Sequence, residues 1–238
     1  MSEMKEQLKR IENTLKRLGS QMSMISLQPG DLRHAQEILG QLRSLVTFVY
    51  FSEDHQCRHC WEEEELLAEL SVLDPKLGLE VHTIGKETGL AEQYDVQKTP
   101  CTIVVGERDY GVRYYGMPSG FEFRVFMQAI RMVSLGESGL GRELKDKVAK
   151  LDRPVHIEVF TTAQCPFSGV AMLTAHQLAM ESEHVRGDVI DVADFPGLVE
   201  HYQVMAAPTV IVNEEKRLCG VASTEEFVDR ILEFSEKV

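Results

Sequence analysis

The sequence predicts an α/β protein in which one folding unit occurs twice, as a mixed sheet with helices on both faces. The first observation is a repeated interval, because Cys57 precedes Pro100 by 43 residues and Cys165 precedes Pro208 by the same 43. The second is that an apolar, strand-like run precedes each cysteine and a helix-like run follows it. The third is that two short strands and an amphipathic helix follow each proline. Elements in this order pack as a sheet covered on both sides.

Each expected element has its own signal in the sequence. The run before each cysteine is almost continuously apolar, as in a central strand with both faces covered. The helix after the first cysteine carries leucines at helical spacing, among them Leu66, Leu67 and Leu70. The expected elements of the first unit span 45–51, 61–73, 78–84, 89–96, 102–105, 110–116 and 121–133. Those of the second unit span 155–160, 169–180, 186–192, 195–204, 209–212, 217–220 and 225–238.

Residues 1–41 lie outside the repeat and are expected to form a helical extension. Its apolar stripe predicts a helix that packs on the first unit, with a dimerisation helix as the alternative. Asp31 is placed to cap a second helix. The boundary between the units, 42–150 and 151–238, falls in a glycine-rich and then charged stretch that closes at Pro154. The stripe consists of Leu8, Ile11, Leu15 and Leu18.

Composition and charge restrict the class of protein. A chain of 238 residues is long enough for two units that each bury a core. Its net charge of −13 argues against nucleic acid or an anionic membrane as a partner. The charged start lacks a signal-peptide run, and the longest apolar run, 45–51, is too short to span a bilayer. We therefore expect a cytoplasmic protein, where a close cysteine pair is more often catalytic or metal-binding than structural.

The stretch "CRHC", residues 57–60, has three interpretations: half of a zinc site, a structural pair, or a redox-active dithiol. His55 and His59 beside Cys57 and Cys60 are suitable zinc ligands in type. A structural zinc site, however, needs four ligands from segments that converge, and the sequence has no second pair. No metal is therefore expected, and the dithiol is favoured.

A strand, a Cys-x-x-Cys at a helix start and a distant proline together resemble a thioredoxin-fold active site. Two such units in tandem resemble the glutaredoxin-like protein disulfide oxidoreductase family, and residues 113–123 and 153–168 look like signature stretches of it. The resemblance covers residues 42–238. It implies two tandem thioredoxin-like folds that exchange disulfides with protein substrates and need no organic cofactor. Glutathione or a thioredoxin-reductase-like flavoprotein would supply the electrons.

Each residue of the motif has an expected role. At a helix start, the helix dipole and free N–H groups stabilise a thiolate. By position and by the resemblance, Cys57 is the attacking thiol and Cys60 resolves the mixed disulfide. His59 can stabilise the Cys57 thiolate, which would favour the reduced form, or can face solvent without effect. The negative charges of 62–65 oppose that tuning, so its net direction stays open.

The two prolines match the family's cis-proline, which faces the cysteine motif. Thr99 before Pro100, and Ala207 before Pro208, would pair with the backbone of a bound peptide. An ordinary trans proline at a strand start is the alternative. By strand alternation, Cys101 points into the core as a buried, inert thiol.

The second unit departs from the pattern, because Ser168 occupies the place of a resolving cysteine. Cys165 therefore belongs to a unit that has become a scaffold, or forms mixed disulfides as a monothiol site. Iron–sulfur ligation is disfavoured, since Pro166 replaces the glycine of the monothiol glutaredoxin motif. Cys219 in the last strand is expected in the core.

One absence concerns proton transfer. Many thioredoxins bury an acid six positions before the first cysteine, and Phe51 stands there in this chain. Solvent, His59, or Glu53 and Asp54 would then handle the proton. The function expected is thiol–disulfide exchange. The alternatives are an electron relay dedicated to one partner, such as a peroxidase or flavoprotein, and an adaptor with a structural cysteine pair.

Overall fold

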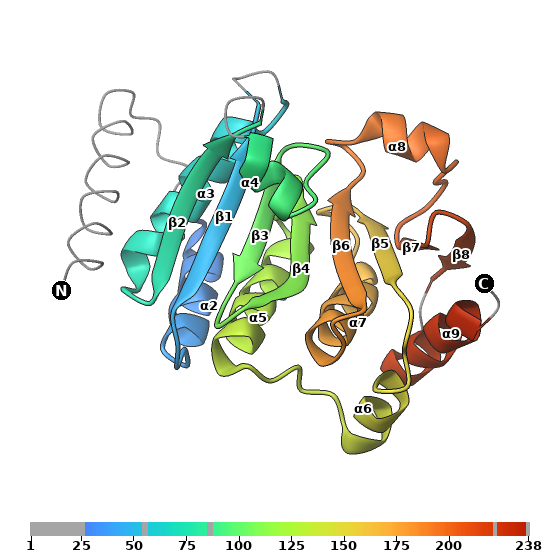
Figure 1. Cartoon of the computed structure of the whole chain (residues 1–238). Coiled ribbons are helices and arrows are strands. Elements are labelled where there is room, and N and C mark those ends of the chain that lie inside the picture. Colours follow the sequence, from blue (N-terminus) through green and yellow to red (C-terminus); the bar gives the residue numbers. More distant parts are fainter. Residues whose placement is uncertain (1–26, 54–56, 85–87, 221–222, 237–238) are drawn as a thin grey trace.

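The computed structural model describes residues 27–53, 57–84, 88–220 and 223–236. Its strands form one eight-stranded sheet in the order β2-β1-β3-β4-β6-β5-β7-β8 (Figure 1). Helices α2, α3, α5 and α7 lie behind this sheet, and α4 and α8 lie in front of it near the upper edge (Figure 1). Among the described residues, no helix is long and apolar enough to cross a membrane.

Both halves show the expected order of strand, helix, strand, helix, strand, strand and helix. The first half contains β1 (Val46–Ser52), α3 (Cys60–Leu73), β2 (Leu77–Thr83), α4 (Thr88–Gln93), β3 (Cys101–Val105), β4 (Asp109–Tyr115) and α5 (Phe121–Leu135). The second half contains β5 (Val155–Thr161), α7 (Ser168–Glu181), β6 (Val185–Asp191), α8 (Pro196–His201), β7 (Thr209–Val212), β8 (Lys216–Cys219) and α9 (Thr224–Glu236). This order confirms the α/β class and the tandem thioredoxin-like folds.

The two halves share one sheet, which the repeat alone did not predict. Strand β4 of the first half pairs in parallel with β6 of the second, from Val112 opposite Gly187 to Tyr115 opposite Ile190. Within each half, the strand before the cysteine is central: β1 pairs with β2 and β3, and β5 pairs with β6 and β7. The carboxyl ends of β1, β4, β5 and β6 therefore lie along the same edge of the sheet.

Two apolar cores stabilise the sheet, one on each face. The larger core lies on the face covered by α2, α3, α5, α7 and α9, where Leu66 and Phe126 are fully buried. The smaller core lies under α4 and α8 and includes Phe51, Cys101 and Phe160. Phe51 packs in this second core, so the position where many thioredoxins carry an acid is apolar here.

Two glycines, both within the signature stretch 113–123, allow the first half to lie close to the second. Gly116 has φ +98°, and a Cβ there would lie 2.7 Å from Asp194 Oδ2. Gly120 has φ +55°, and a Cβ there would collide with the backbone oxygen of Ala163. Only glycine suits this close approach and this backbone conformation. The loop between β4 and α5 is thereby held between two loops of the second half.

The structure also bears on the expected N-terminal helices, the linker between the halves and Cys219. Helix α2 (Pro29–Leu39) packs Ala35, Ile38 and Leu39 into the larger core. Asp31 was wrongly expected to cap this helix: the helix begins at Pro29 with Gln28 at the N-cap, so the expected turn is its first turn and Asp31 lies within it. The apolar stripe on residues 8–18 lies outside the described residues, and the boundaries at 41 and 150 stay predictions. The expected linker contains a short helix, α6 (Arg142–Val148). Cys219 was wrongly expected in the core: it is exposed, because β8 is an edge strand with alternate residues facing out.

Candidate active site

Cys57 and Cys60 form a disulfide at the start of α3, with their Cα atoms 5.4 Å apart. Helix α3 begins at Cys60, so both sulfurs lie near the free N–H groups and the positive end of the helix dipole. Cys60 is only 6% exposed, whereas Cys57 is half-buried. A partner thiol therefore has access to Cys57 rather than to Cys60.

The second half reaches across to this motif. His59 Nδ1 lies 2.5 Å from Oδ1 of Asp194, in the loop between β6 and α8. Arg58 donates from Nη1 to the backbone oxygen of neighbouring Ala193 at 3.1 Å. A carboxylate oxygen can only accept from an imidazole, so Nδ1 carries the hydrogen and Asp194 fixes the ring's orientation. His59 therefore has a partner in the second half, and its effect on the dithiol stays a prediction.

Polar groups lie directly behind the disulfide, in an otherwise apolar environment. Tyr50 on β1 donates its O–H to the backbone oxygen of Cys60 at 2.7 Å. Thr102 on β3 donates its O–H to Glu63 Oε1 at 2.6 Å, and Glu63 is fully buried. Burial raises the pKa of Glu63 well above its ordinary value; the bond from Thr102 opposes this rise and nearby Asp194 adds to it. Of the four glutamates after the motif, Glu63 is therefore the one that lies fully in the core.

The first proline lies where the repeat places it. The Thr99–Pro100 peptide bond is cis, as expected, and so is Ala207–Pro208. Pro100 is buried while Thr99 is half-buried, and Trp61, after the motif, is 39% exposed. Cys101 is fully buried, and burial raises the pKa of its thiol to about 12. That environment confirms Cys101 as a buried thiol.

The corresponding place in the second half holds one thiol. Cys165 is 9% exposed, and its Sγ lies 3.3 Å from the backbone oxygen of Ala207, before the second cis-proline. Ser168 is 1% exposed, and its hydroxyl has no hydrogen-bond partner among the described residues. Phe167 and Met205 are strongly exposed, at 76% and 90%. The structure thus brings the Cys165 sulfur to Ala207, the residue before Pro208, while Ser168 begins α7.

A second buried acid, Glu122 at the start of α5, lies between the halves. It is 2% exposed, and Oε1 has no hydrogen-bond partner in the described part of the chain. Burial raises its pKa to about 8; Asp191 on β6 adds to the rise, and Thr161 on β5 opposes it. Burial also raises the pKa of Asp191. Acidic groups thus gather along the edge of the sheet that carries both cysteine positions.

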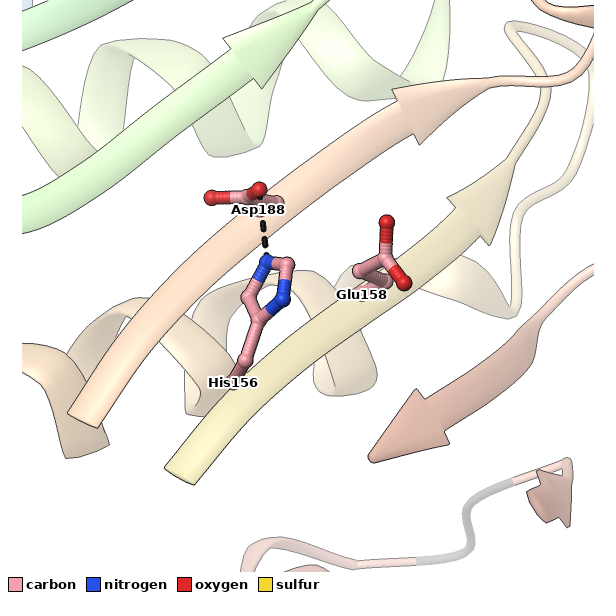
Figure 2. A group of neighbouring side chains, drawn as sticks. All are labelled: His156, Glu158 and Asp188. Carbon is pink, nitrogen blue, oxygen red and sulfur yellow. Dashed lines mark hydrogen bonds and ion pairs between the residues drawn. The ribbon is translucent and has the colours of Figure 1, made fainter. Parts of the chain in front are cut away.

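His156, Glu158 and Asp188 form a group with metal-ligand spacing, each offering a ligand atom within 4.8 Å of the others (Figure 2). Asp188 is fully buried, and Arg186 donates to both of its carboxylate oxygens at 2.8 Å. Lys98 from the first half pairs with Glu158 at 3.5 Å. Two cations thus balance the two carboxylates, so this group is an ion-pair network, and it also joins the halves.

The network has a clear effect on Asp188. Burial alone would raise the pKa of its carboxyl, but hydrogen bonds from His156 and Arg186 outweigh burial and lower it well below its ordinary range. Arg186 extends the network into the first half, since it also binds the Asp95 carboxylate at 2.7 Å and the Tyr115 hydroxyl at 2.8 Å. This arrangement stabilises the join between β4 and β6.

Sequence reasoning missed Asp194, Tyr50, Glu122 and the burial of Glu63. Asp194 is 135 residues from His59, and no local spacing links them. Glu63 did have a signal: it stands three residues before Leu66 and seven before Leu70, on the same helical face as the leucines. The glutamate run around it hid that periodicity.

Comparisons with known proteins agree with this fold. Residues 155–233 match the family model described as a thioredoxin domain. A protein disulfide oxidoreductase from Aeropyrum pernix K1 superimposes with a TM-score of 0.81 at 24% identity, covering 89% of this chain and 95% of that one. The N-terminal domain of alkylhydroperoxide reductase AhpF from Enterococcus faecalis (V583) gives 0.79 at 22% identity, covering 86% and 100%. At these identities the likeness shows the fold.

Curated relatives extend the comparison. The AhpF component of alkyl hydroperoxide reductase from Xanthomonas campestris pv. phaseoli is 26% identical over 168 residues, which are 70% of this chain and 30% of that protein. An NADH dehydrogenase from Bacillus subtilis (strain 168) is 28% identical over 142 residues, which are 59% and 28%. The chain thus spans about a third of the length of these relatives.

The fold and the site define a thioredoxin-fold protein with a Cys-x-x-Cys disulfide. The comparisons support the resemblance to thioredoxin-like oxidoreductases that its sequence shows.

Proposed function

We propose that this protein exchanges disulfides with protein substrates through Cys57 and Cys60. The observation that carries the proposal is the Cys57–Cys60 disulfide at the start of α3, where the more accessible sulfur belongs to Cys57. The electrons travel through the cysteines themselves, so the reaction needs no organic cofactor. Cytoplasmic location and the source of electrons belong to the same proposal.

The exchange has two steps. The Cys57 thiolate attacks a substrate disulfide, and a mixed disulfide forms while one substrate thiolate leaves. Cys60 then attacks the Cys57 sulfur, which releases the second substrate thiolate and restores the Cys57–Cys60 disulfide. Thr99 and Pro100 hold the substrate backbone beside the motif during the first step. The helix start stabilises the Cys57 thiolate throughout.

His59 and Asp194 set the balance between the oxidised and reduced forms. A carboxylate next to an imidazole stabilises positive charge on the ring. A positive ring one residue before Cys60 stabilises the Cys57 thiolate and so favours the reduced form. In this proposal the second unit, whose Cys165 has no cysteine partner in its motif, acts mainly as a scaffold for the first site.

Trapping tests the exchange. The variant Cys60→Ser is expected to accumulate a mixed disulfide with a peptide disulfide, because the resolving thiol is gone. Cys57→Ser should form no adduct at the motif, and Cys165→Ser should behave as the wild type. Mass spectrometry of the quenched protein identifies the site. Equal labelling of Cys57→Ser and Cys60→Ser at the motif would refute the proposal.

A relay dedicated to one redox partner is a second candidate, favoured by the relatives named as the AhpF component of alkyl hydroperoxide reductase. Glutathione or a flavoprotein would reduce the Cys57–Cys60 disulfide, and a peroxidase disulfide would receive the electrons. A relay should reduce insulin slowly and a thiol-dependent peroxidase quickly. A general exchanger should reduce both at comparable rates, which steady-state assays with the two acceptors distinguish.

A further inference from the structure

Glu63 is a buried carboxyl group that the exchange steps above do not use. It is fully buried, and its Oε1 accepts the hydrogen bond from Thr102 at 2.6 Å. Its Oε2 is also buried and has no hydrogen-bond partner among the described residues. An acid with an unused oxygen in the core lowers stability, so its presence beside a reactive motif indicates a functional role.

The position of Glu63 is close to the resolving cysteine. It lies three residues after Cys60 in α3, so the two side chains are neighbours on one helical face. Side chains in a helix lean towards its N-terminus, and Glu63 therefore covers the turn that carries Cys60. Both residues are buried, while Tyr50 binds the Cys60 backbone oxygen from β1. Cys60 thus faces the protein interior, where solvent is a poor source of protons.

Groups from three other elements interact with Glu63 by a hydrogen bond or by charge, and of these Cys101 lies on the opposite face of the sheet. They are Tyr50 on β1, Cys101 and Thr102 on β3, and Asp194 in the loop after β6. Burial raises the pKa of Glu63, the bond from Thr102 opposes that rise, and Asp194 adds to it. Glu63 therefore holds a proton at pH values where an ordinary glutamate has lost it. Its proton affinity is thereby closer to that of a thiol, which suits transfer between the two.

From this placement we propose that Glu63 donates a proton to Cys60 when the disulfide is reduced and takes it back when the disulfide forms. The proposal rests on the disulfide exchange proposed above. In reduction, a donor thiolate attacks the Cys57 sulfur, a new bond joins the donor to Cys57, and the Cys57–Cys60 bond breaks. The electron pair goes to the Cys60 sulfur, which takes the proton from Glu63. In oxidation, the Glu63 carboxylate removes the Cys60 proton as Cys60 attacks Cys57 and the substrate thiolate leaves.

This role supplies what the sequence lacked. The position six residues before Cys57 holds Phe51, and the expected substitutes were solvent, His59, or Glu53 and Asp54. Glu63 provides the acid from the helix instead of from the strand.

The variant Glu63→Gln tests the proposal, because it keeps the size and the bond to Thr102 but cannot exchange a proton. Trp61 is the only tryptophan and follows Cys60, so its fluorescence reports the redox state of the pair. Stopped-flow reduction of the oxidised variant by dithiothreitol at pH 7 should be at least about tenfold slower than in wild type. The fluorescence change of both proteins confirms that the variant folds around the same disulfide.

A titration of Cys60 supplies a readout that a structural role would not change. In Cys57→Ser, thiolate absorbance at 240 nm, measured against Cys57→Ser/Cys60→Ser, should rise in two steps, because Cys60 and Glu63 share a proton. Adding Glu63→Gln should leave one step. Thr102→Val should move the upper step to higher pH, since it removes a bond that favours the ionised carboxyl. Glu62→Gln, which removes a charge from the same turn, should keep both steps.

Two failures are distinguishable. If Cys57 and Cys60 of the wild type never exchange with a thiol–disulfide buffer, the proposed function fails. If they do exchange, but Glu63→Gln retains the wild-type reduction rate and the two-step titration, the role of Glu63 is wrong and the exchange stands.

Discussion

Replacing Asp194 with asparagine should make the protein a stronger reductant. Asparagine keeps the size of the side chain and can still accept the hydrogen bond from His59 Nδ1. It cannot stabilise positive charge on the ring as a carboxylate does. The reduced form, with its thiolate on Cys57, therefore loses more stabilisation than the oxidised form. The midpoint potential should fall.

The size of this fall follows from the contact. Asp194 is almost fully buried, with 2% of its side chain exposed, while the His59 ring is 33% exposed, so solvent screens the pair only in part. A hydrogen bond to a charged group contributes about 1.5–3 kcal/mol, and part of that is present in both redox states. A difference of about 1.4 kcal/mol between the states corresponds to about 30 mV for a two-electron couple.

The assay is an equilibrium titration in glutathione buffers, followed by the fluorescence of Trp61. Asp194→Asn should lower the midpoint by about 30 mV, and His59→Gln should lower it by at least as much. The double variant should match His59→Gln alone, because Asp194 acts through the ring. An unchanged or higher midpoint for Asp194→Asn with His59 intact would refute this reasoning.

Three further predictions follow from buried groups. The pKa of Glu122 is about 8 in the folded chain and 4.5 in the unfolded chain. Between these pH values the folded form retains a proton that the unfolded form releases. The free energy of unfolding therefore falls as pH rises from about 4.5 to about 8. Glu122→Gln should remove this fall, which amounts to about 5 kcal/mol in urea denaturation, and an unchanged slope would contradict it. Asp188→Ala should lower the free energy of unfolding by about 3 kcal/mol at pH 7, because Arg186 loses a buried partner. A decrease of less than about 1 kcal/mol in the same denaturation assay would count against the ion-pair network. Cys219 should alkylate at least about 100-fold faster than Cys101 in the native protein by mass analysis, and equal rates would contradict their burial.

Much of the fold could be predicted from the sequence because the repeat made each half a check on the other. A single Cys-x-x-Cys is a weak signal, but a proline 43 residues after Cys57 and again after Cys165 fixes the order of elements. The single sheet could not be predicted. The loop after β4 approaches the second half closely at Gly116 and Gly120, and these glycines carry no sign of which loops they approach.

The site was predictable only where chemistry lies in a local pattern. Cys57 and Cys60 lie at the start of a helix and the Thr99–Pro100 bond is cis, as expected, and Cys101 is buried as alternation predicted. Asp194 comes from the other half, so only the folded chain brings it to the motif. Residues 62–65 were expected to act as negative charges on the dithiol, but Glu63 is fully buried and burial raises the pKa of its carboxyl, which the sequence did not indicate.

The most direct test of the central claim is a count of free thiols across a series of glutathione redox ratios. The protein is equilibrated, quenched with an alkylating reagent and analysed by mass. Disulfide exchange predicts that Cys57 and Cys60 gain and lose label together, as one two-electron step. A pair that never titrates, or that gains label only after a chelator is added, would contradict the claim and assign the motif a structural or metal-binding role.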